Sequence, residues 1–303
     1  MSATKSLVWL ITGSSSGFGK SLTLHALRAG HKVIATSRTP SGVPKLVEEV
    51  EELGGIYLQL DVTSPKEELQ KIVEQGVRDF GRIDVLVNCA GIGILGALED
   101  VNEQECQNIM ATNVFGPLNL IQIILPYMRS QKSGTIVNIS SGSGIDPRPS
   151  MGLYGASKFA LEGLSQGLAK EVSCFGIRIL IVQPGAFTTR MMDSVTLTAK
   201  RSKAYDGTDV GQWMAKFDPD SPEGKSFKAP HDVEKGAAAI LEVVTGTGRG
   251  EGKLEHLRLL LSREVAEGTK KRVEGIMADR EAFRDIWENT AHDGGVLKAF
   301  EDL

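Results

Sequence analysis

Short apolar runs alternate with amphipathic stretches from the start of the chain to about Gln183. The runs are LVWLIT, KVIATS, IYLQLD, IDVLVN, GTIVNIS and IRILIVQ. Helical periodicity lies between them, near residues 20–29, 44–53, 65–80, 103–129 and 154–175. This alternation predicts parallel strands joined by crossover helices. Because the runs are apolar on both faces, we expect helices on each side of the sheet. The predicted fold class is α/β, a doubly wound parallel sheet.

The pattern changes after Gly185. Residues 188–229 are rich in Lys, Asp, Ser, Met and Pro, with Trp213 and Phe217 as isolated large apolar residues. A polar insertion of this length is more often a binding segment than an idle loop. Helical periodicity resumes at 233–244, LRLLL at 257–261 predicts a last strand, and 263–289 is charged and helical. We therefore expect one domain over 1–303, with a substrate lid at 190–230 and a C-terminal extension at 246–303.

The composition narrows the class of protein. The chain has 303 residues, 41% hydrophobic and 24% charged, which is ordinary globular usage. Its formal net charge of −4 gives no footprint for nucleic acid. The three cysteines and five histidines are scattered without ligand spacing, so no metal site is expected. The sequence shows neither a signal peptide nor a membrane span, and a cytoplasmic location is expected.

A glycine-rich stretch, TGSSSGFG, follows the first apolar run directly. Glycine permits positive φ and close backbone contact, and the helix that follows offers unpaired N–H groups to a pyrophosphate. This strand, turn and helix order is typical of the Rossmann fold. A flexible turn is the alternative interpretation. The predicted cofactor-binding residues of this stretch are Gly13, Ser15, Ser16, Gly17, Phe18 and Gly19.

The ends of the next strands indicate which dinucleotide binds. The second run ends in Ser37 and Arg38, with no acid to accept hydrogen bonds from the adenosine ribose. A guanidinium there can pair with a 2′-phosphate, which favours NADP(H) over NAD(H). The alternative is a solvated Arg38 with Ser37 alone meeting the ribose. Further cofactor contacts are expected where the third and fourth runs end, at Asp61, Val62, Asn88, Ala90 and Gly91.

Tyr154 and Lys158 are four residues apart on a predicted helix, so they share one face. A tyrosine normally titrates near pH 10, and a nearby positive charge favours its phenolate. This pair therefore predicts a tuned acid or base, and with a nucleotide cradle it suggests redox chemistry at a carbonyl or alcohol. The alternative is an ordinary amphipathic pair of residues.

Taken together, these motifs resemble the short-chain dehydrogenase/reductase family over most of the chain. The matching features, in the family's order, are TGSSSGFG, NCAG at 88–91, Asn113, Ser141, Tyr154-x-x-x-Lys158, and Pro184-Gly185 with Thr189. Cys89 stands where the family more often has a second Asn, and we interpret it as a small buried residue. The region after Thr189 resembles, more loosely, the longer 17β-hydroxysteroid dehydrogenase-like members.

The resemblance implies a role for each residue. Tyr154 would donate the proton in reduction, and Lys158 would lower the pKa of its phenol and contact the nicotinamide ribose. Ser141 would orient the substrate oxygen, although Ser140 or Ser143 could replace it in a shifted register. Asn113 would help to hold a water linked to Lys158. The nicotinamide carboxamide would meet Pro184, Gly185 and Thr189.

The expected function is an NADP(H)-dependent carbonyl reductase for a small-molecule ketone or aldehyde that is apolar or resembles a secondary metabolite. The alternatives are an NAD-dependent alcohol or hydroxysteroid dehydrogenase and a non-catalytic NADP(H)-binding sensor. The family resemblance also implies a homodimer or homotetramer. Arg148 and Arg190 are candidates to bind a substrate carboxylate. A mainly apolar pocket is predicted from residues that flank the catalytic group in sequence: Ile92, Ile94, Leu95, Ile145, Met151, Leu153, Phe187, Met191 and Met192.

Overall fold

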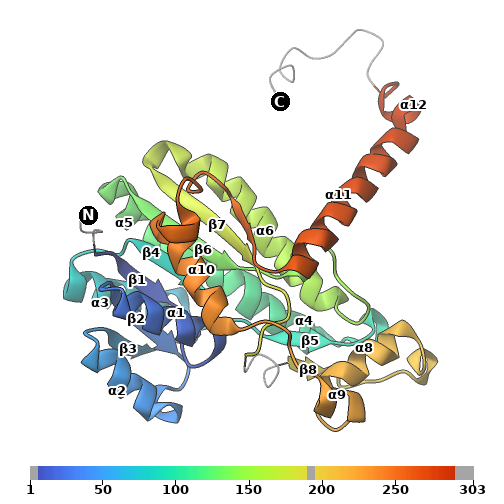
Figure 1. Cartoon of the computed structure of the whole chain (residues 1–303), viewed down its shortest axis with the longest axis horizontal. Helices are drawn as coiled ribbons and strands as arrows, with labels where there is room; N and C mark the ends of the chain where they lie inside the picture. The colour runs from blue at the N-terminus through green and yellow to red at the C-terminus, as the bar shows by residue number, and fades with distance from the viewer. Residues whose placement is uncertain (1–5, 190–194, 291–303) are drawn as a thin grey trace.

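The computed structural model describes residues 6–189 and 195–290, and its central feature is a seven-stranded parallel sheet (Figure 1). The strand order is β3-β2-β1-β4-β6-β7-β9. This confirms the predicted doubly wound sheet, including its last strand. The strands are β1 (Val8–Ile11), β2 (Lys32–Ser37), β3 (Ile56–Gln59), β4 (Val85–Asn88), β6 (Gly134–Ile139), β7 (Ile177–Gln183) and β9 (Arg258–Leu260).

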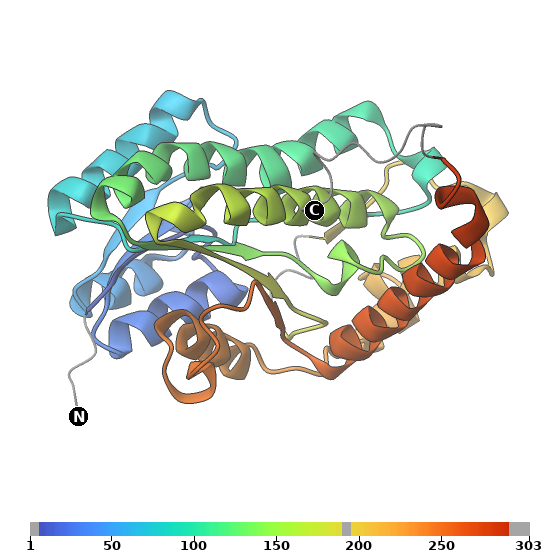
Figure 2. The same ribbon diagram turned by 90° about the horizontal axis from the view of Figure 1, so that it is seen from above.

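Helices cover both faces of this sheet, as Figure 2 shows. One face packs against α1 (Gly17–Arg28), α2 (Pro44–Glu52) and α10 (Val233–Thr245). The opposite face packs against α3 (Lys66–Phe80), α5 (Gly116–Gln131) and α6 (Gly152–Val172). Each face therefore has its own apolar core, which is why the strands carry apolar residues on both sides.

The strand order reverses between β1 and β4, since the chain builds β1, β2 and β3 outward and then crosses to β4, β6 and β7. In an open α/β sheet, ligands bind at this reversal, beyond the carboxyl ends of the strands. The glycine-rich stretch follows β1 and the NCAG stretch follows β4. The topology thus brings two segments far apart in sequence to the same edge of the sheet.

The helix expected over 103–129 is interrupted. The structure has α4 (Glu103–Met110), a π-helical turn η3 (Ala111–Phe115) and then α5. A π-helical turn inserts an extra residue into the helix and is frequent at functional sites. Asn113 lies in this turn. Periodicity alone did not predict the turn, because the apolar pattern continues across it.

The described part of the predicted lid, 190–230, contains one short strand and two short helices, and its strand pairs with a strand from outside it. The strand β5 (Gly93–Leu95) pairs in parallel with β8 (Val195–Leu197), followed by α8 (Asp209–Phe217) and α9 (Pro222–Ser226). Strands of three residues are too short to show periodicity, so the sequence did not predict this pair. Short 3₁₀ turns connect other elements: η1 (Pro40–Gly42), η2 (Leu98–Asp100), η4 (Gly142–Gly144), η5 (Ser173–Phe175), η6 (Lys203–Tyr205) and η7 (Gly248–Gly250).

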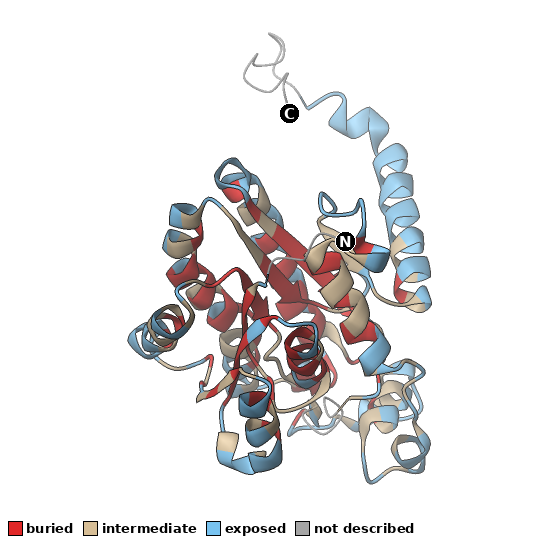
Figure 3. Ribbon diagram, turned by 60° about the vertical axis from the view of Figure 1, so that its left-hand side comes forward, coloured by how far each residue is buried: buried red, intermediate tan, exposed pale blue. Residues whose placement is uncertain are grey.

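The chain continues into α11 (Arg263–Ala282) and α12 (Arg284–Trp287). Figures 1 and 3 show α11 leaving the body of the molecule, and nearly all of its surface is exposed. Its first turns are the exception, since Val265 is buried. Helix α11 therefore contacts the rest of the fold through its first turns.

One helical stretch, Glu103–Gln131, is long and apolar enough to cross a membrane, but 50% of its most apolar window is buried inside the molecule. A core helix of a soluble protein passes the same test. In the described ranges, no cluster of three or more His, Cys, Asp or Glu residues could hold a metal ion.

Candidate active site

A single continuous cavity of about 910 Å³ lies at the carboxyl ends of the strands. Its walls come from the loops after β1, β2, β3, β4, β6 and β7, from the lid, and from the first turns of α11. Tyr154, Lys158 and Ser141 line its middle. One end therefore reaches the glycine-rich loop and the other reaches the lid.

The glycine-rich loop has the backbone geometry of a phosphate cradle. Gly13 and Gly17 have φ angles of 69° and 54°, a region that L side chains avoid. At Gly13 a Cβ would lie 2.9 Å from the backbone of Ala90, and at Gly19 it would meet the carbonyl of Gly13. Ser16 is the N-cap of α1, but its hydroxyl accepts no hydrogen bond from the helix. The helix N–H groups there have no side-chain cap, which suits an anion.

Most of the residues predicted in the glycine-rich loop line the cavity, and one supports the loop from behind. The cavity wall includes Gly13, Ser15, Ser16, Gly17 and Phe18. Gly19 packs behind it, where a side chain would push the loop out of place.

Thr12 is a structural residue of the cradle that the sequence analysis did not single out. Its hydroxyl oxygen accepts hydrogen bonds from the N–H groups of Cys89 (3.0 Å) and Ala90 (3.1 Å). It thereby holds the glycine-rich loop to the NCAG stretch across the reversal of the strand order. The position of Thr12 at the end of the first apolar run is the feature of the sequence that could have identified it.

The far end of the cradle is formed by Ser37, Arg38, Asp61 and Val62, all of which line the cavity. Arg38 is exposed and has no ion pair with any residue in the described ranges. Asp61 accepts hydrogen bonds from the backbone N–H (2.9 Å) and the hydroxyl (2.7 Å) of Thr63. This turn fixes the carboxylate. The residues therefore offer a cation and an anion where an adenosine ribose would lie.

The NCAG stretch contributes backbone more than side chains. Ala90 and Gly91 line the cavity, and a Cβ at Gly91 would lie 3.7 Å from Lys158 Nζ. Asn88 does not line it. Its amide donates to Asn138 Oδ1 (2.8 Å), and Asn138 donates to Ser165 (2.8 Å). Asn88, predicted as a cofactor contact, instead ties β4 to β6 in the buried sheet.

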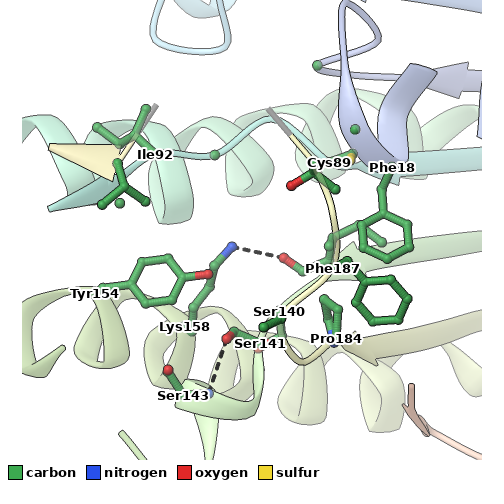
Figure 4. A pocket seen from close by; sticks show the side chains of 18 of the residues that line it. Phe18, Cys89, Ile92, Ser140, Ser141, Ser143, Tyr154, Lys158, Pro184 and Phe187 are labelled. Carbon is green, nitrogen blue, oxygen red and sulfur yellow. Dashed lines mark hydrogen bonds between the residues drawn. The ribbon is translucent and has the colours of Figure 1, made fainter. Parts of the chain in front are cut away.

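Tyr154 and Lys158 project together from α6 into the middle of the cavity, as Figure 4 shows. Lys158 Nζ lies 5.7 Å from the centre of the tyrosine ring and donates to the carbonyl of Ile139 (2.9 Å). Both side chains are buried. The helical spacing thus places the phenol and the ammonium side by side.

Burial changes the pKa of both groups. It raises the pKa of Tyr154 to about 12, while a hydrogen bond with Ser141 acts to lower it. It lowers the pKa of Lys158 to about 8, while Cys89 and Glu162 act to raise it. The lowered phenol pKa that was expected from Lys158 is therefore not observed, because burial is the dominant influence on the pKa of Tyr154. Tyr154 is protonated near neutral pH, the state that can donate a proton.

Ser141 is the serine that interacts with Tyr154, which resolves the question of register. It accepts a hydrogen bond from the N–H of Ser143 (3.1 Å). The hydroxyl of Ser140 donates to Glu162 (2.6 Å), and that of Ser143 points to the sulfur of Met151 (3.6 Å). Of these three serines, only Ser141 forms a hydrogen bond with the phenol.

Asn113 supports the site from behind the cavity wall. Its side chain donates to the carbonyl of Ile92 (2.9 Å) and to Ser157 Oγ (3.0 Å), and it accepts from the N–H of Ile92 (2.9 Å). It is 1% exposed. The π-helical turn brings it between β5 and α6, so it fixes the loop beside Gly91.

Cys89 lines the cavity, and burial raises the pKa of its thiol to about 11, with Lys158 acting in the opposite direction. A thiol with a raised pKa stays protonated and is a poor nucleophile. Cys89 is half-buried at the cavity wall rather than fully buried as expected, but its raised pKa agrees with an unreactive residue.

The lid end of the cavity is mainly apolar. Trp213 and Phe217 stack with ring centres 6.2 Å apart, and Phe217 contacts Phe227 at 5.8 Å. Arg148 lies 4.7 Å from the Trp213 ring. The apolar and aromatic lining residues here are Ile92, Leu95, Met151, Phe187, Val195, Trp213, Phe217 and Phe227.

Some residues predicted for this pocket are elsewhere. Ile94 and Leu153 pack in a small core around Tyr154, so core packing is their role. Ile145 does not line the cavity. The other predicted residues, Arg190, Met191 and Met192, lie outside the described ranges.

The segment after β7 is held from two sides. Pro184, Gly185 and Thr189 line the cavity, as predicted for a nicotinamide contact. The ring of Phe187 packs edge-on against Phe18 of α1, with centres 4.9 Å apart. A Cβ at Gly185 would collide with Glu264, so the start of α11 lies directly against this segment.

A histidine directly after the predicted lid contacts α11. His231 Nε2 lies 2.8 Å from both carboxylate oxygens of Glu264, and its carbonyl accepts from the N–H of Thr188 (2.8 Å). Val265, Gly268 and Thr269 of α11 also line the cavity. The C-terminal extension is therefore a wall of the site.

Comparisons with known proteins agree with this geometry. The family model for the short chain dehydrogenases matches residues 7–200. The oxidoreductase BOA17 of Botryotinia fuckeliana is 34% identical over 279 residues, covering 92% of this chain and 97% of that protein. The 3-ketodihydrosphingosine reductase of Bacteroides thetaiotaomicron is 43% identical over 201 residues, covering 66% and 71%.

Solved structures share the fold. A short-chain dehydrogenase from Streptomyces avermitilis superposes with a TM-score of 0.82 at 32% identity, covering 95% of this chain and 99% of that one. Others with this fold are complexes with NAD or with NADP. The chain belongs to the short-chain dehydrogenase/reductase family, whose members are oxidoreductases that use a nicotinamide dinucleotide.

Proposed function

We propose that this protein is an NADP(H)-dependent carbonyl reductase acting on an apolar ketone or aldehyde. The observation that carries the proposal is the single cavity in which Ser141, Tyr154 and Lys158 lie between the glycine-rich loop and the aromatic lid. A dinucleotide in the cradle and a carbonyl under the lid would both reach these three side chains.

Tyr154, Ser141 and Lys158 each have a different role in the reduction. A bound nicotinamide dinucleotide supplies the hydride. Tyr154, protonated at neutral pH, donates its proton to the carbonyl oxygen, which Ser141 orients by a hydrogen bond. The Lys158 ammonium stabilises the phenolate that remains. The product is an alcohol, and oxidation of an alcohol reverses these steps.

Arg38 supports the preference for NADP(H). It is an exposed cation at the end of β2, without an ion pair to another described residue, in the cavity wall beside Ser37. A guanidinium can form paired hydrogen bonds with a 2′-phosphate. The ElxO structure, 29% identical to this chain, holds NADP, which is consistent with this preference.

The substrate class follows from the lid end. Its aromatic and aliphatic walls favour an apolar molecule, and one relative is named as a reductase of 3-ketodihydrosphingosine. A panel of ketones and aldehydes of increasing apolar length, with NADPH consumption as the readout, tests the proposal. Cofactor binding without turnover of any panel member would support a non-catalytic sensor instead.

Arg38→Ala tests the cofactor preference. We expect kcat/KM with NADPH to fall by about 10- to 100-fold while that with NADH changes little, because a charge-assisted pair is lost. The matched control is Lys32→Ala, a cation exposed at the other end of β2. Equal loss with both cofactors, or better activity with NADH in the wild type, would contradict the NADP(H) assignment and favour an NAD-dependent alcohol dehydrogenase.

The proposed assembly is a homodimer or homotetramer in the cytoplasm. Phe115, Phe159 and Leu164, at the start of α5 and on α6, are 53%, 44% and 38% exposed. Large apolar side chains at the surface favour a protein interface. Light scattering of the purified chain measures the oligomeric state.

A further inference from the structure

A buried carboxylate lies next to the catalytic group but has no part in the chemistry described above. Glu162 is on α6, one turn beyond Lys158 and two turns beyond Tyr154, so the three side chains follow one face of the helix. It is 2% exposed. Carboxylates are almost never fully buried unless they are paired, so its partners define what it does.

The partners of Glu162 join two strand ends. Its Oε1 accepts hydrogen bonds from Ser140 Oγ (2.6 Å) and from Gln183 Nε2 (2.8 Å). Ser140 directly precedes Ser141, and Gln183 directly precedes Pro184. One oxygen atom therefore fixes the starts of the two segments that hold the substrate serine and the proposed nicotinamide contact.

The loop above the carboxylate is packed against it. A Cβ at Gly144, in the turn η4 after Ser141, would collide with Glu162 Oε1 and lie 2.6 Å from Ser140 Oγ. A glycine is needed here because the backbone of η4 passes directly over the carboxylate. Movement of Glu162 would thus be transmitted to η4 and to Ser141.

The charge of Glu162 acts on Lys158. Burial lowers the pKa of Lys158, and Glu162 and Cys89 oppose this effect, as noted above. The hydrogen bond of Lys158 goes to the carbonyl of Ile139, which adjoins Ser140. On the other side, Arg258 of β9 lies 3.6 Å from Glu162 Oε2. Arg258 of β9 is therefore the cation paired with this carboxylate, while Lys158, one turn earlier on α6, is influenced by the charge of Glu162.

We propose that Glu162 is a positioning residue for the reduction, which holds Ser141 and the Pro184 segment in place and keeps Lys158 protonated. This inference rests on the proposed function, because it assigns Glu162 a role in the same site. It does not make Glu162 a catalytic residue, since its carboxylate contacts Ser140, Gln183 and Arg258 rather than the reacting atoms.

The test is Glu162→Gln, which keeps the shape of the side chain and removes its charge. Reduction requires the Lys158 ammonium, so activity is lost as pH rises through the pKa of Lys158. Without the carboxylate this pKa falls further, and the alkaline limb of the kcat profile moves to lower pH by about one unit. At pH 8 we expect kcat to fall by about fivefold, because the protonated fraction of Lys158 falls by that factor, with KM within about threefold of the wild type.

Ser165→Ala is the matched control. Ser165 is another buried polar residue of α6, hydrogen-bonded to Asn138 and to the carbonyl of Leu161. Its loss should lower the melting temperature without moving the alkaline limb. If Glu162→Gln and Ser165→Ala both leave the pH profile where it is in the wild type, Glu162 is only structural and the proposal is wrong.

A second measurement does not require turnover. The pKa of Lys158 is obtained from the pH dependence of its acetylation by trace acetic anhydride, followed by mass spectrometry of the peptide. A lower pKa in Glu162→Gln supports the proposal even if no substrate has been found, and an unchanged pKa overturns it. A different result would contradict the proposed function, namely that the wild-type protein reduces no ketone.

Glu162→Asp separates the charge from the geometry, and it replaces Glu162→Gln if that variant does not fold. The shorter side chain keeps the charge but cannot reach both Ser140 and Gln183. We expect the alkaline limb to stay within about 0.3 pH unit of the wild type, and kcat to fall several-fold. Wild-type kcat in this variant would contradict the positioning role.

Discussion

The two ends of the cavity are built differently. At the cofactor end the functional residues follow central strands directly, and all four residues of β1 are buried. At the substrate end the described part of the predicted lid has two short helices and the three-residue strand β8, which pairs with β5, and α8 buries Met214. In the first region the backbone places the functional groups, whereas in the second, side-chain contacts place them.

Because of this difference, the reaction depends on one end of the cavity and the choice of substrate depends on the other. Glycine conformations and strand ends are set by the sheet, so the cradle and the catalytic helix are common to proteins with many substrates. The two segments that flank the predicted lid are held by the contacts of Phe187 with Phe18 and of His231 with Glu264, which a few substitutions could rearrange. The comparison predicts that changes at the cofactor end abolish function, while changes at the substrate end modulate it.

The largest effect should come from Tyr154→Phe, which removes the proton donor and leaves the cradle intact. We expect kcat to fall by about 10³-fold, because general acid catalysis contributes on this scale. The dissociation constant for NADPH, measured by fluorescence titration, should stay within about threefold. Tyr127→Phe, the same change on α5, is the control. Substantial turnover by Tyr154→Phe would place the acid elsewhere.

Gly17→Ala should weaken cofactor binding by about tenfold. A side chain at a φ of 54° costs about 1–2 kcal/mol, and its Cβ would lie 3.2 Å from Cβ of Thr189. Isothermal titration with NADPH measures the loss. The control is Gly163→Ala on α6, whose Cβ would have no atom within 4 Å. Equal affinities in the two variants would show that the loop geometry does not matter for binding.

Trp213→Ala and Phe217→Ala test the substrate end. Each should raise KM for an apolar ketone by about tenfold through lost apolar contact, and leave the NADPH dissociation constant unchanged. Trp287→Ala on α12, which does not line the cavity, is the control. If cofactor affinity falls as much as KM rises, the lid belongs to both ends and the distinction drawn above fails.

The smallest effect is expected at Glu264. Burial acts to raise the pKa of this carboxyl, but hydrogen bonds, including that with His231, lower it below its usual value. Its stabilising contribution is therefore present above about pH 4.5 and is lost as pH falls below it. Because the pair is partly exposed, we expect Glu264→Gln to lower Tm at pH 7 by only about 1–2 °C.

The difference in Tm between wild type and Glu264→Gln should shrink between about pH 5 and pH 3.5. Calorimetric scans at several pH values measure it. A difference that is constant with pH would mean that the charge of Glu264 does not stabilise the attachment of the lid to α11.

The sequence predicted most of the regular elements and the catalytic helix, because these depend on local periodicity and short spacings. It missed the β5–β8 pair, whose strands are too short to show a period, and the π-helical turn that carries Asn113. It assigned Asn88 to the cofactor, whereas its side chain bonds to Asn138, fifty residues away in sequence. Contacts between distant segments were thus the main source of error.

By itself, the sequence determined the chemistry available to this protein: a cradle of glycines after a buried strand, and Tyr154 one helical turn from Lys158. These features are local, so their geometry follows from the backbone conformations of a few neighbouring residues. Only the tertiary structure decided that burial raises the pKa of Tyr154, that Glu162 joins two strand ends beside it, and that the first turns of α11 form part of the cavity wall. Those properties depend on solvent exclusion and on contacts across the fold, which no local pattern encodes.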